Sequence, residues 1–285
     1  MKNRKAGLSL LLAAVFALGF AGSWLGVLVF AKDASAEPTE GVVGYDAVYS
    51  AQNPIPEIAA NIRPSVVQVV NAAETWSTST RELSEQEIGY GSGTYILEAE
   101  DGAGGFILTN YHVVESGDRY KIIWLDGTEM TCTLVGYDDG TDIAVLRFSE
   151  DAPAGAMPVP TGDSDQLQIG ELAIVIGNPG AGDYVLYGTV TSGIISGLER
   201  GQISAGNFTR SVSVIQTDAA INAGNSGGAL LNARGELVGI PTLKMSHSMS
   251  AVYEGLGFCV PINTVKGLVE EIIETGKVSR PMLGV

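Results

Sequence analysis

One serine lies in a stretch whose residue types suit it to act as a nucleophile. Ser226 lies in QTDAAINAGNSGGAL, residues 216–230, with glycines at 224, 227 and 228. Glycine permits backbone conformations that are closed to other residues and lets a substrate approach closely. A serine hydroxyl is a poor nucleophile at neutral pH, so this chemistry also needs a nearby base and a third group that orients the base.

The chain offers few candidates for the base. Its two histidines are His112, which follows the apolar run 106–108, and His247, which lies in the polar stretch KMSHSMS. The end of a strand would hold the imidazole of His112 firmly, whereas His247 is expected to be an exposed loop residue. Asp142 stands at the head of TDIAVLRF, whose apolar positions predict another strand. The predicted nucleophile, base and orienting acid are therefore Ser226, His112 and Asp142.

An alternative for the serine motif is the nucleophile elbow G-x-S-x-G of α/β-hydrolases, which residues 224–228 also satisfy. That fold requires a helix directly after the serine, with an acid and then a histidine later in the chain. Residues 229–239 instead predict two short strands around a turn at 232–235, and Glu236 is the only acid between Ser226 and His247. The motif therefore lacks the context that this fold demands.

The three motifs together resemble one protease family. TNYHVV, TDIAVL and QTDAAINAGNSGG, followed by GELVGI and GLGFCVPIN, resemble the HtrA/Deg branch of trypsin-like serine proteases. The resemblance covers residues 54–285 and implies an all-β, chymotrypsin-like fold: two six-stranded antiparallel β-barrels with a C-terminal helix. It also implies a serine endopeptidase that cleaves unfolded or damaged extracytoplasmic proteins in quality control or stress. The competing hypothesis is a membrane-tethered binder that keeps this fold but does not cut.

The resemblance further implies the parts around the nucleophile. Gly224, Asn225 and Ser226 would build the oxyanion hole, with the N–H groups of Gly224 and Ser226 as its donors. Trypsin-type zymogens carry an aspartate where this chain has Asn225, so activation by a newly cut N-terminus is not expected.

Substrate-binding positions also follow from the resemblance. The pocket for the residue before the cut would be shaped by Ala220 and Ile221, and an edge for the extended substrate would come from Ile240, Pro241 and Thr242. Ala220 stands where enzymes of basic specificity hold an acid, so we expect cleavage after small aliphatic residues such as valine or alanine. Asp218 is expected to be a structural carboxylate. Many relatives have asparagine in place of Pro241, and proline removes one backbone donor from this edge.

Composition agrees with an all-β protein. The 285 residues include 37 glycines, with 45% hydrophobic and 17% charged residues and few long amphipathic patterns. We expect a protease domain over residues 54–285, with the first barrel at about 65–150, the second at about 160–262 and a helix at about 263–276. Asn263 would cap that helix and Gly276 would end it. Residues 75–90 are expected to be a polar loop, and residues 125–128 a tight hairpin turn.

The N-terminus predicts a membrane anchor. Lys2, Arg4 and Lys5 precede an uncharged run at 6–31, which is long enough to cross a bilayer as a helix. Residues 1–36 are therefore predicted to be a cytoplasmic stub and a transmembrane signal anchor of a bacterial cell membrane, with 37–53 as a linker and the protease outside. The A-x-A triplet at 34–36 is a site at which a signal peptidase could cut. The alternative is therefore a cleaved signal peptide and a secreted protease.

The remaining expectations concern partners. The net charge of −16 disfavours nucleic acid, whose phosphates bind clustered lysine and arginine. No cofactor and no metal site is expected, and Cys132 and Cys259 are expected to be buried free thiols. The resemblance suggests a homotrimer acting on unfolded proteins. A PDZ domain usually follows residue 279 in this family, but the sequence ends at Val285, so it is expected to be either a form without PDZ or part of a longer protein.

Overall fold

The computed structural model describes residues 53–77, 81–100, 102–181, 184–200, 213–244, 247–248, 251–252 and 255–278. Contacts divide the chain into two units, Met1–Asn53 and Pro54–Val285. The predicted membrane anchor lies outside the described residues. Within the described ranges no helix has the length and hydropathy needed to span a membrane.

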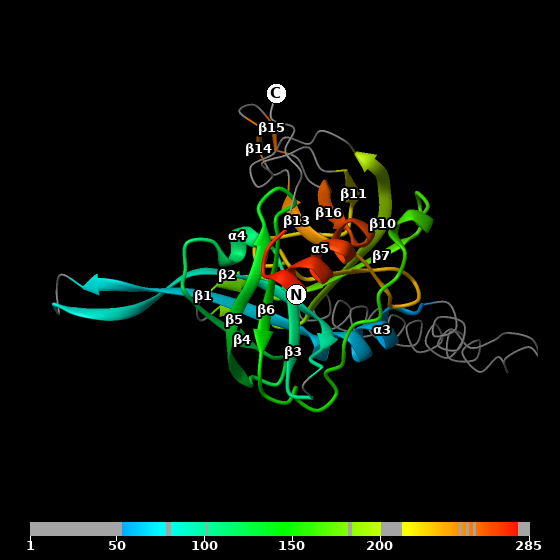
Figure 1. The fold of residues 1–285 in the computed structure, drawn as a ribbon. Helices are drawn as coiled ribbons and strands as arrows, with labels where there is room; N and C mark the ends of the chain where they lie inside the picture. Colours follow the sequence, from blue (N-terminus) through cyan, green and yellow to red (C-terminus); the bar gives the residue numbers. More distant parts are fainter. Residues whose placement is uncertain are drawn as a thin grey trace, which may run out of the picture. The chain divides into compact units, whose positions relative to one another are not determined.

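Six antiparallel strands close the first barrel, in the order β1-β2-β3-β6-β5-β4 (Figure 1). β-Branched residues dominate the inward positions, as in VVQVV at the start of the first strand, and they pack well on a pleated surface. The core is completed by Tyr95, Trp124 and Phe148, which meet edge to face with ring centroids 5.3–5.9 Å apart. The strands are β1 Val66–Ser77, β2 Glu82–Glu98, β3 Gly105–Thr109, β4 Arg119–Ile123, β5 Glu129–Asp138 and β6 Ile143–Phe148.

Six more strands close the second barrel, in the order β10-β11-β16-β13-β12-β7. These are β7 Leu172–Gly177, β10 Thr189–Arg200, β11 Val214–Thr217, β12 Ala229–Leu231, β13 Leu237–Lys244 and β16 Gly257–Pro261. Two short hairpins join them, β8 Gly180–Ala181 with β9 Tyr184–Val185, and β14 His247–Ser248 with β15 Ala251–Val252. His247 therefore lies in a strand and not in a strandless loop, because local antiparallel pairing to Val252 suffices to order it.

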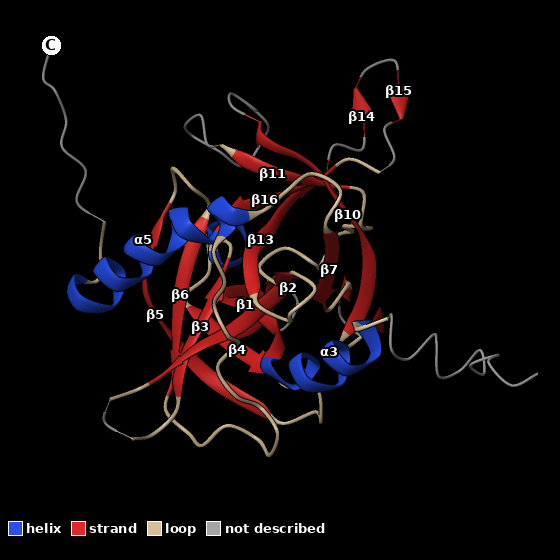
Figure 2. Cartoon of the chain, turned by 90° about the vertical axis from the view of Figure 1, so that its right-hand side faces the viewer, coloured by secondary structure: helices blue, strands red, loops and turns tan. Residues whose placement is uncertain are grey.

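The two barrels share one apolar core that the C-terminal helix helps to close. α5, Ile262–Thr275, contacts β5 and β6 of the first barrel and β13 and β16 of the second (Figure 2). This core includes Leu108 from the first barrel, Ile174 from the second barrel and Val265 from α5, and all three are buried. Two more helices, α3 Ile55–Ile62 and α4 Tyr111–Val114, and the 3₁₀ turns η1 Arg63–Ser65 and η2 Ser164–Gln166 complete the described elements. This architecture confirms the predicted pair of six-stranded barrels with a C-terminal helix.

The ends of α5 confirm one predicted boundary and correct the other. Gly276 follows the helix with a left-handed φ of 75°, as a C-terminal glycine should. Asn263, however, does not cap the N-terminus, where Pro261 stands instead. The Asn263 amide donates to Asp163 Oδ1 at 2.6 Å, so its side chain ties α5 to the start of the second barrel. The tight turn at 125–128 is also present, with Gly127 at φ 87°.

The segment expected to be a loop at 75–90 is a two-stranded ribbon. β1 and β2 stay paired from Val66↔Thr94 to Ser77↔Glu82, with one register shift after Asn71, and the ribbon extends well beyond the barrel (Figure 1). Backbone hydrogen bonds hold such a ribbon whatever the polarity of its side chains, and composition cannot reveal that pairing. Trp76 and Leu83 face each other near its end and are 61% and 62% exposed.

Candidate active site

The three residues predicted to act together come from both barrels. His112 lies in the one-turn helix α4, Tyr111–Val114, which follows β3. Asp142 directly precedes β6, so both of these belong to the first barrel. Ser226 lies in the connection between β11 and β12 of the second barrel. The candidate site is therefore formed where the two barrels meet.

His112 and Asp142 form a hydrogen-bonded pair. The Nδ1 atom of His112 lies 2.7 Å from Asp142 Oδ2, and the backbone N–H of His112 donates to Oδ1 at 2.9 Å. The aspartate is fully buried, while the histidine side chain is 30% exposed. One carboxylate thus fixes both the backbone and the ring of the histidine.

The backbone of Asp142 is held in an uncommon conformation. Its φ is 59°, in the left-handed region that costs free energy for a residue other than glycine. Its carbonyl oxygen accepts from the Asn110 side chain at 2.7 Å and from the Tyr111 N–H at 3.1 Å. These bonds connect the aspartate to the segment that carries His112, and they compensate for the strained backbone.

Thr242 provides a third contact to the buried carboxylate. Its hydroxyl donates to Asp142 Oδ2 at 2.5 Å, and its side chain is buried. Thr242 was predicted to belong to the substrate edge, and its bond to Asp142 was not expected, because the two residues are 100 positions apart. The carboxylate therefore receives donors from both barrels.

Contacts through β2 bring Ser226 to the same place. A Cβ atom at Gly91 would lie 2.6 Å from a methyl group of Val113, the residue after His112, and 3.1 Å from the Ser226 carbonyl oxygen. The next residue, Ser92, donates its backbone N–H to that same carbonyl at 2.8 Å. Only glycine fits at position 91, so this close approach of the serine turn to the histidine helix is built into the sequence.

The chain before Ser226 forms a turn of defined type. The Asn225 N–H donates to the Asn222 carbonyl at 3.0 Å, and Gly224 stands at the third position of this turn with φ 96°. A positive φ at that position is the mark of a type II turn. Within the described residues, the backbone N–H groups of Gly224 and Ser226 donate to no backbone carbonyl.

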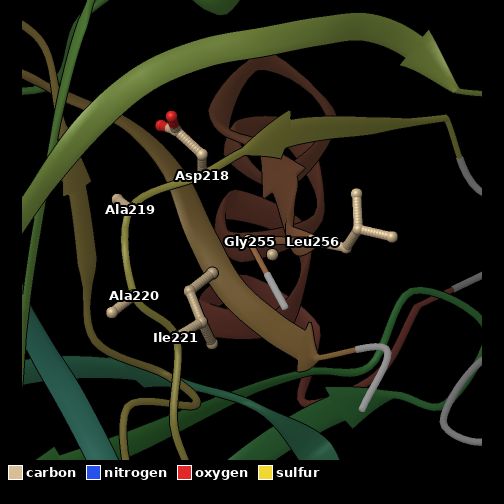
Figure 3. A pocket seen from close by; sticks show the side chains of 7 residues that line it. Asp218, Ala219, Ala220, Ile221, Gly255 and Leu256 are labelled. Atoms are coloured by element: carbon tan, nitrogen blue, oxygen red, sulfur yellow. The ribbon is translucent and has the colours of Figure 1, made fainter. Parts of the chain in front are cut away.

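A pocket of about 260 Å³ lies beside this turn. One wall is formed by residues 218–221 and the other by residues 255–257, with Ile221 and Leu256 as the apolar side chains (Figure 3). Ala220 and Ile221, predicted to shape a specificity pocket, both line this pocket. Asp218 also borders it, and its Oδ1 accepts from the Ile194 N–H at 2.7 Å, which is the structural role expected of it.

The predicted substrate edge differs in detail from the expectation. The Ile240 side chain is fully buried in the shared core, and the Pro241 carbonyl accepts from the Gly227 N–H at 3.0 Å. Pairing with β12 covers β13 at Leu237 and Gly239, whereas β16 covers its other side as far as Lys244. Among the described strands, none pairs with β13 on its β12 side beyond Gly239.

Two aromatic residues beside His112 were not singled out by the sequence. The rings of Tyr111 and Tyr137 stack with centroids 4.3 Å apart. Burial, followed by the charges of Tyr137 and Glu115, raises the pKa of Tyr111 above its usual value. The motif TNYHVV shows that Tyr111 precedes His112, but the sequence does not show that Tyr137 of β5 stacks on Tyr111.

Both cysteines lie in the described part of the chain. Cys132 and Cys259 are free and buried, as predicted. Burial raises the pKa of the Cys132 thiol to about 12, and it raises that of Cys259 as well. In the described part of the chain, His, Cys, Asp and Glu residues form no group suited to a metal ion.

Comparison with known proteins identifies the family. A model of the trypsin-like peptidase domain matches residues 91–240. The chain is 42% identical over 238 residues to the serine protease Do-like HtrA of Bacillus subtilis (strain 168), covering 81% of this chain and 51% of that protein. The solved structure of the HtrA-type protease AlgW with decapeptide superimposes with a TM-score of 0.64 at 33% identity, covering 81% of this chain and 70% of the other.

The chain belongs to the HtrA family of trypsin-like serine proteases. Another HtrA relative, the periplasmic pH-dependent serine endoprotease DegQ of Escherichia coli (strain K12), is 39% identical over 197 residues, covering 69% of this chain and 40% of its own length. The chain spans about half of the length of three curated relatives that it matches. The region that matches the trypsin-like peptidase domain contains His112, Asp142 and Ser226.

Proposed function

We propose that this chain is a serine endopeptidase in which Ser226 is the nucleophile, His112 the general base and Asp142 the residue that orients the base. The observation that carries the proposal is the buried set of bonds from His112 and Thr242 to Asp142, lying beside the glycine-rich turn of Ser226. This is the arrangement in which a base is held, oriented and given a hydroxyl to activate.

The hydrogen bond from Nδ1 to Asp142 defines how His112 works. It keeps the proton on Nδ1, so Nε2 is the ring atom that accepts the proton of the Ser226 hydroxyl. The serine Oγ then bonds to the carbonyl carbon of the substrate, and the electron pair of the C=O bond moves to its oxygen. His112 next donates the proton to the leaving amine as the C–N bond breaks. Water hydrolyses the resulting acyl-enzyme by the same steps, with the alcohol of Ser226 as the leaving group.

The Gly224 and Ser226 amides would stabilise the oxyanion of this reaction. The type II turn at 222–225 and the free state of both amides within the described backbone support this assignment. Asn225 shapes the turn between the two donors. Loss of one donor in such a site typically lowers kcat by about 100- to 1000-fold.

The pocket beside the turn supports cleavage after small aliphatic residues. Ala220 and Ile221 on one wall and Leu256 on the other offer apolar contacts, and about 260 Å³ accommodates a valine or alanine side chain. The acid at the rim, Asp218, is already bonded to a backbone N–H. The extended substrate would pair with the backbone of β13 from residue 242 onward, beyond the proline at 241.

The biological setting is proposed from the relatives. The matched proteases include enzymes named as periplasmic, which supports action on extracytoplasmic, unfolded or damaged proteins. We place the protease outside the membrane, anchored through residues 6–31, in a homotrimer. Membrane fractionation and light scattering of the purified protein test the anchor and the trimer; a protein found in the soluble fraction, or a monomer at every concentration, would contradict them.

Digestion of unfolded casein tests the activity itself. The wild-type protein should release peptides whose new C-termini are mainly valine or alanine when mapped by mass spectrometry. Ser226→Ala, which keeps the fold, should release none. Cleavage mainly after arginine or lysine would contradict the specificity, and a folded wild-type protein that only binds casein would favour the non-catalytic alternative.

A further inference from the structure

Ser92 of the first barrel touches the turn of the second barrel that carries Ser226. It is fully buried, and its hydroxyl donates to the Gly224 carbonyl at 2.6 Å. The same oxygen accepts the Asn178 N–H at 2.8 Å. A backbone N–H can only donate, so the single hydroxyl proton of Ser92 is directed to Gly224. The backbone N–H of Ser92 donates to the Ser226 carbonyl at 2.8 Å.

These bonds fix the peptide unit that precedes the Ser226 amide. The unit between Gly224 and Asn225 is held at its carbonyl by the Ser92 hydroxyl and at its N–H by the Asn222 carbonyl, at 3.0 Å. Glycine at φ 96° rotates more freely than any other residue, so the hydroxyl supplies a restraint that Gly224 itself lacks.

The peptide unit that follows the Ser226 amide is fixed in the same way. Its carbonyl accepts from the Ser92 N–H, and its N–H, from Gly227, donates to the Pro241 carbonyl at 3.0 Å. The amide of Ser226 lies between two peptide units that are each held at both ends. Its direction is therefore set by contacts in which Ser92 takes part on both sides.

Ser92 is itself held rigidly. Its carbonyl accepts the Thr109 hydroxyl at 2.7 Å, three residues before His112. A Cβ atom at Gly227 would lie 2.2 Å from that carbonyl oxygen, so Ser92 and Gly227 are packed with no space between them for a side chain. Ser92 thus joins the segment that carries the base to the segment that carries the nucleophile.

We propose that Ser92 is a positioning residue that aims the Gly224 and Ser226 amides at the oxyanion, an inference that rests on the proposed protease function. Without its hydroxyl, the Gly224 carbonyl and the Asn178 N–H are left buried and unpaired, and the turn can rotate to find other partners. The chemistry of the nucleophile and base is unchanged, so the loss falls on stabilisation of the transition state.

The test compares Ser92→Ala with Ser92→Thr and with Ser65→Ala as matched control. Ser65 is equally buried, and its hydroxyl oxygen also accepts a backbone N–H, from Met157 at 2.9 Å, away from the serine turn. We measure kcat and KM on a peptide substrate, and the affinity for a peptide aldehyde, whose hemiacetal oxygen occupies the oxyanion hole, relative to the same peptide as an amide.

Ser92→Ala should lower kcat by about 10- to 100-fold, less than the loss of a whole donor, with KM unchanged. The aldehyde-to-amide affinity ratio should fall by the same factor, Ser92→Thr should restore both values, and Ser65→Ala should match the wild type. A purely structural role would lower stability and leave this ratio alone.

An unchanged kcat and affinity ratio in folded Ser92→Ala would overturn the proposal. If that variant does not fold, Ser92→Cys, which replaces the hydroxyl by a weaker donor, serves in its place, and wild-type kcat there would be equally decisive. An inactive wild-type protein would instead refute the proposed function, so the two failures are distinguishable.

Discussion

Replacing Asp142 by asparagine should nearly abolish proteolysis while the fold stays intact. The carboxylate accepts three hydrogen bonds, one at Oδ1 from the His112 backbone N–H and two at Oδ2 from the His112 ring and the Thr242 hydroxyl. An asparagine offers one accepting oxygen and one NH₂ group, which only donates. Either orientation of the amide conflicts with this set of donors.

Each orientation has a definite consequence. With the NH₂ group in the place of Oδ2, His112 must accept at Nδ1, so its proton moves to Nε2 and the ring can no longer take a proton from Ser226. With the NH₂ group in the place of Oδ1, it faces the backbone N–H of His112, and both of these groups are donors. The first orientation keeps more bonds, because the Thr242 hydroxyl can turn and donate elsewhere or accept.

The expected loss of kcat is that of an enzyme whose histidine base is held in the wrong tautomer. The same substitution in the general Ser-His-Asp template lowers kcat by about 10⁴, or about 5.5 kcal/mol in activation free energy. We expect a loss of this order here, because the aspartate is fully buried and no water can replace the missing acceptor.

The assay is kcat on a peptide substrate, with circular dichroism to verify the fold and Asp138→Asn as control. Asp138 is a buried aspartate nearby, whose Oδ2 accepts from the Thr141 N–H and hydroxyl at 2.9 and 2.6 Å. A folded Asp142→Asn protein that retained more than about a tenth of the wild-type kcat would refute the reasoning, since the tautomer would then not matter.

Three further outcomes follow from individual contacts. Thr242→Val should lower kcat by about 10- to 100-fold, because a hydrogen bond to a charged group contributes about 1.5–3 kcal/mol; wild-type kcat would show that this bond to Asp142 is dispensable. Gly227→Ala should lower the free energy of unfolding in urea by about 1–3 kcal/mol, since its φ is 84° and the new Cβ has no room, and an unchanged midpoint would contradict this. Cys132 and Cys259 should resist a thiol reagent at about pH 8 in the folded protein and react in denaturant, because burial raises the pKa of both thiols; rapid reaction of the native protein would show that they are accessible.

The sequence predicts the architecture and the candidate site well where the signal is local. Turn residues between short strands indicate an all-β protein, and the family resemblance adds the two six-stranded barrels. Three short motifs select Ser226, His112 and Asp142 as the candidate residues. The helix at the C-terminus is likewise readable from its apolar face and from Gly276.

What the sequence misses depends on contacts between distant segments. The polar composition of residues 75–90 favoured a loop, yet β1 and β2 pair there through their backbones. The bond from Thr242 to Asp142 and the bonds from Ser92 to the serine turn join residues 100 and 132 positions apart. Asn263 had the right residue type for a cap, but its amide is used by Asp163 instead.

Labelling with a fluorophosphonate tests the central claim most directly. The reagent forms a covalent bond to an activated serine, and mass spectrometry then locates the labelled residue. The account predicts a single labelled site, Ser226, in the wild-type protein, with labelling lost in Ser226→Ala and in His112→Ala, both still folded. Labelling at another residue, or labelling of Ser226 that persists without His112, would contradict the proposed nucleophile and base.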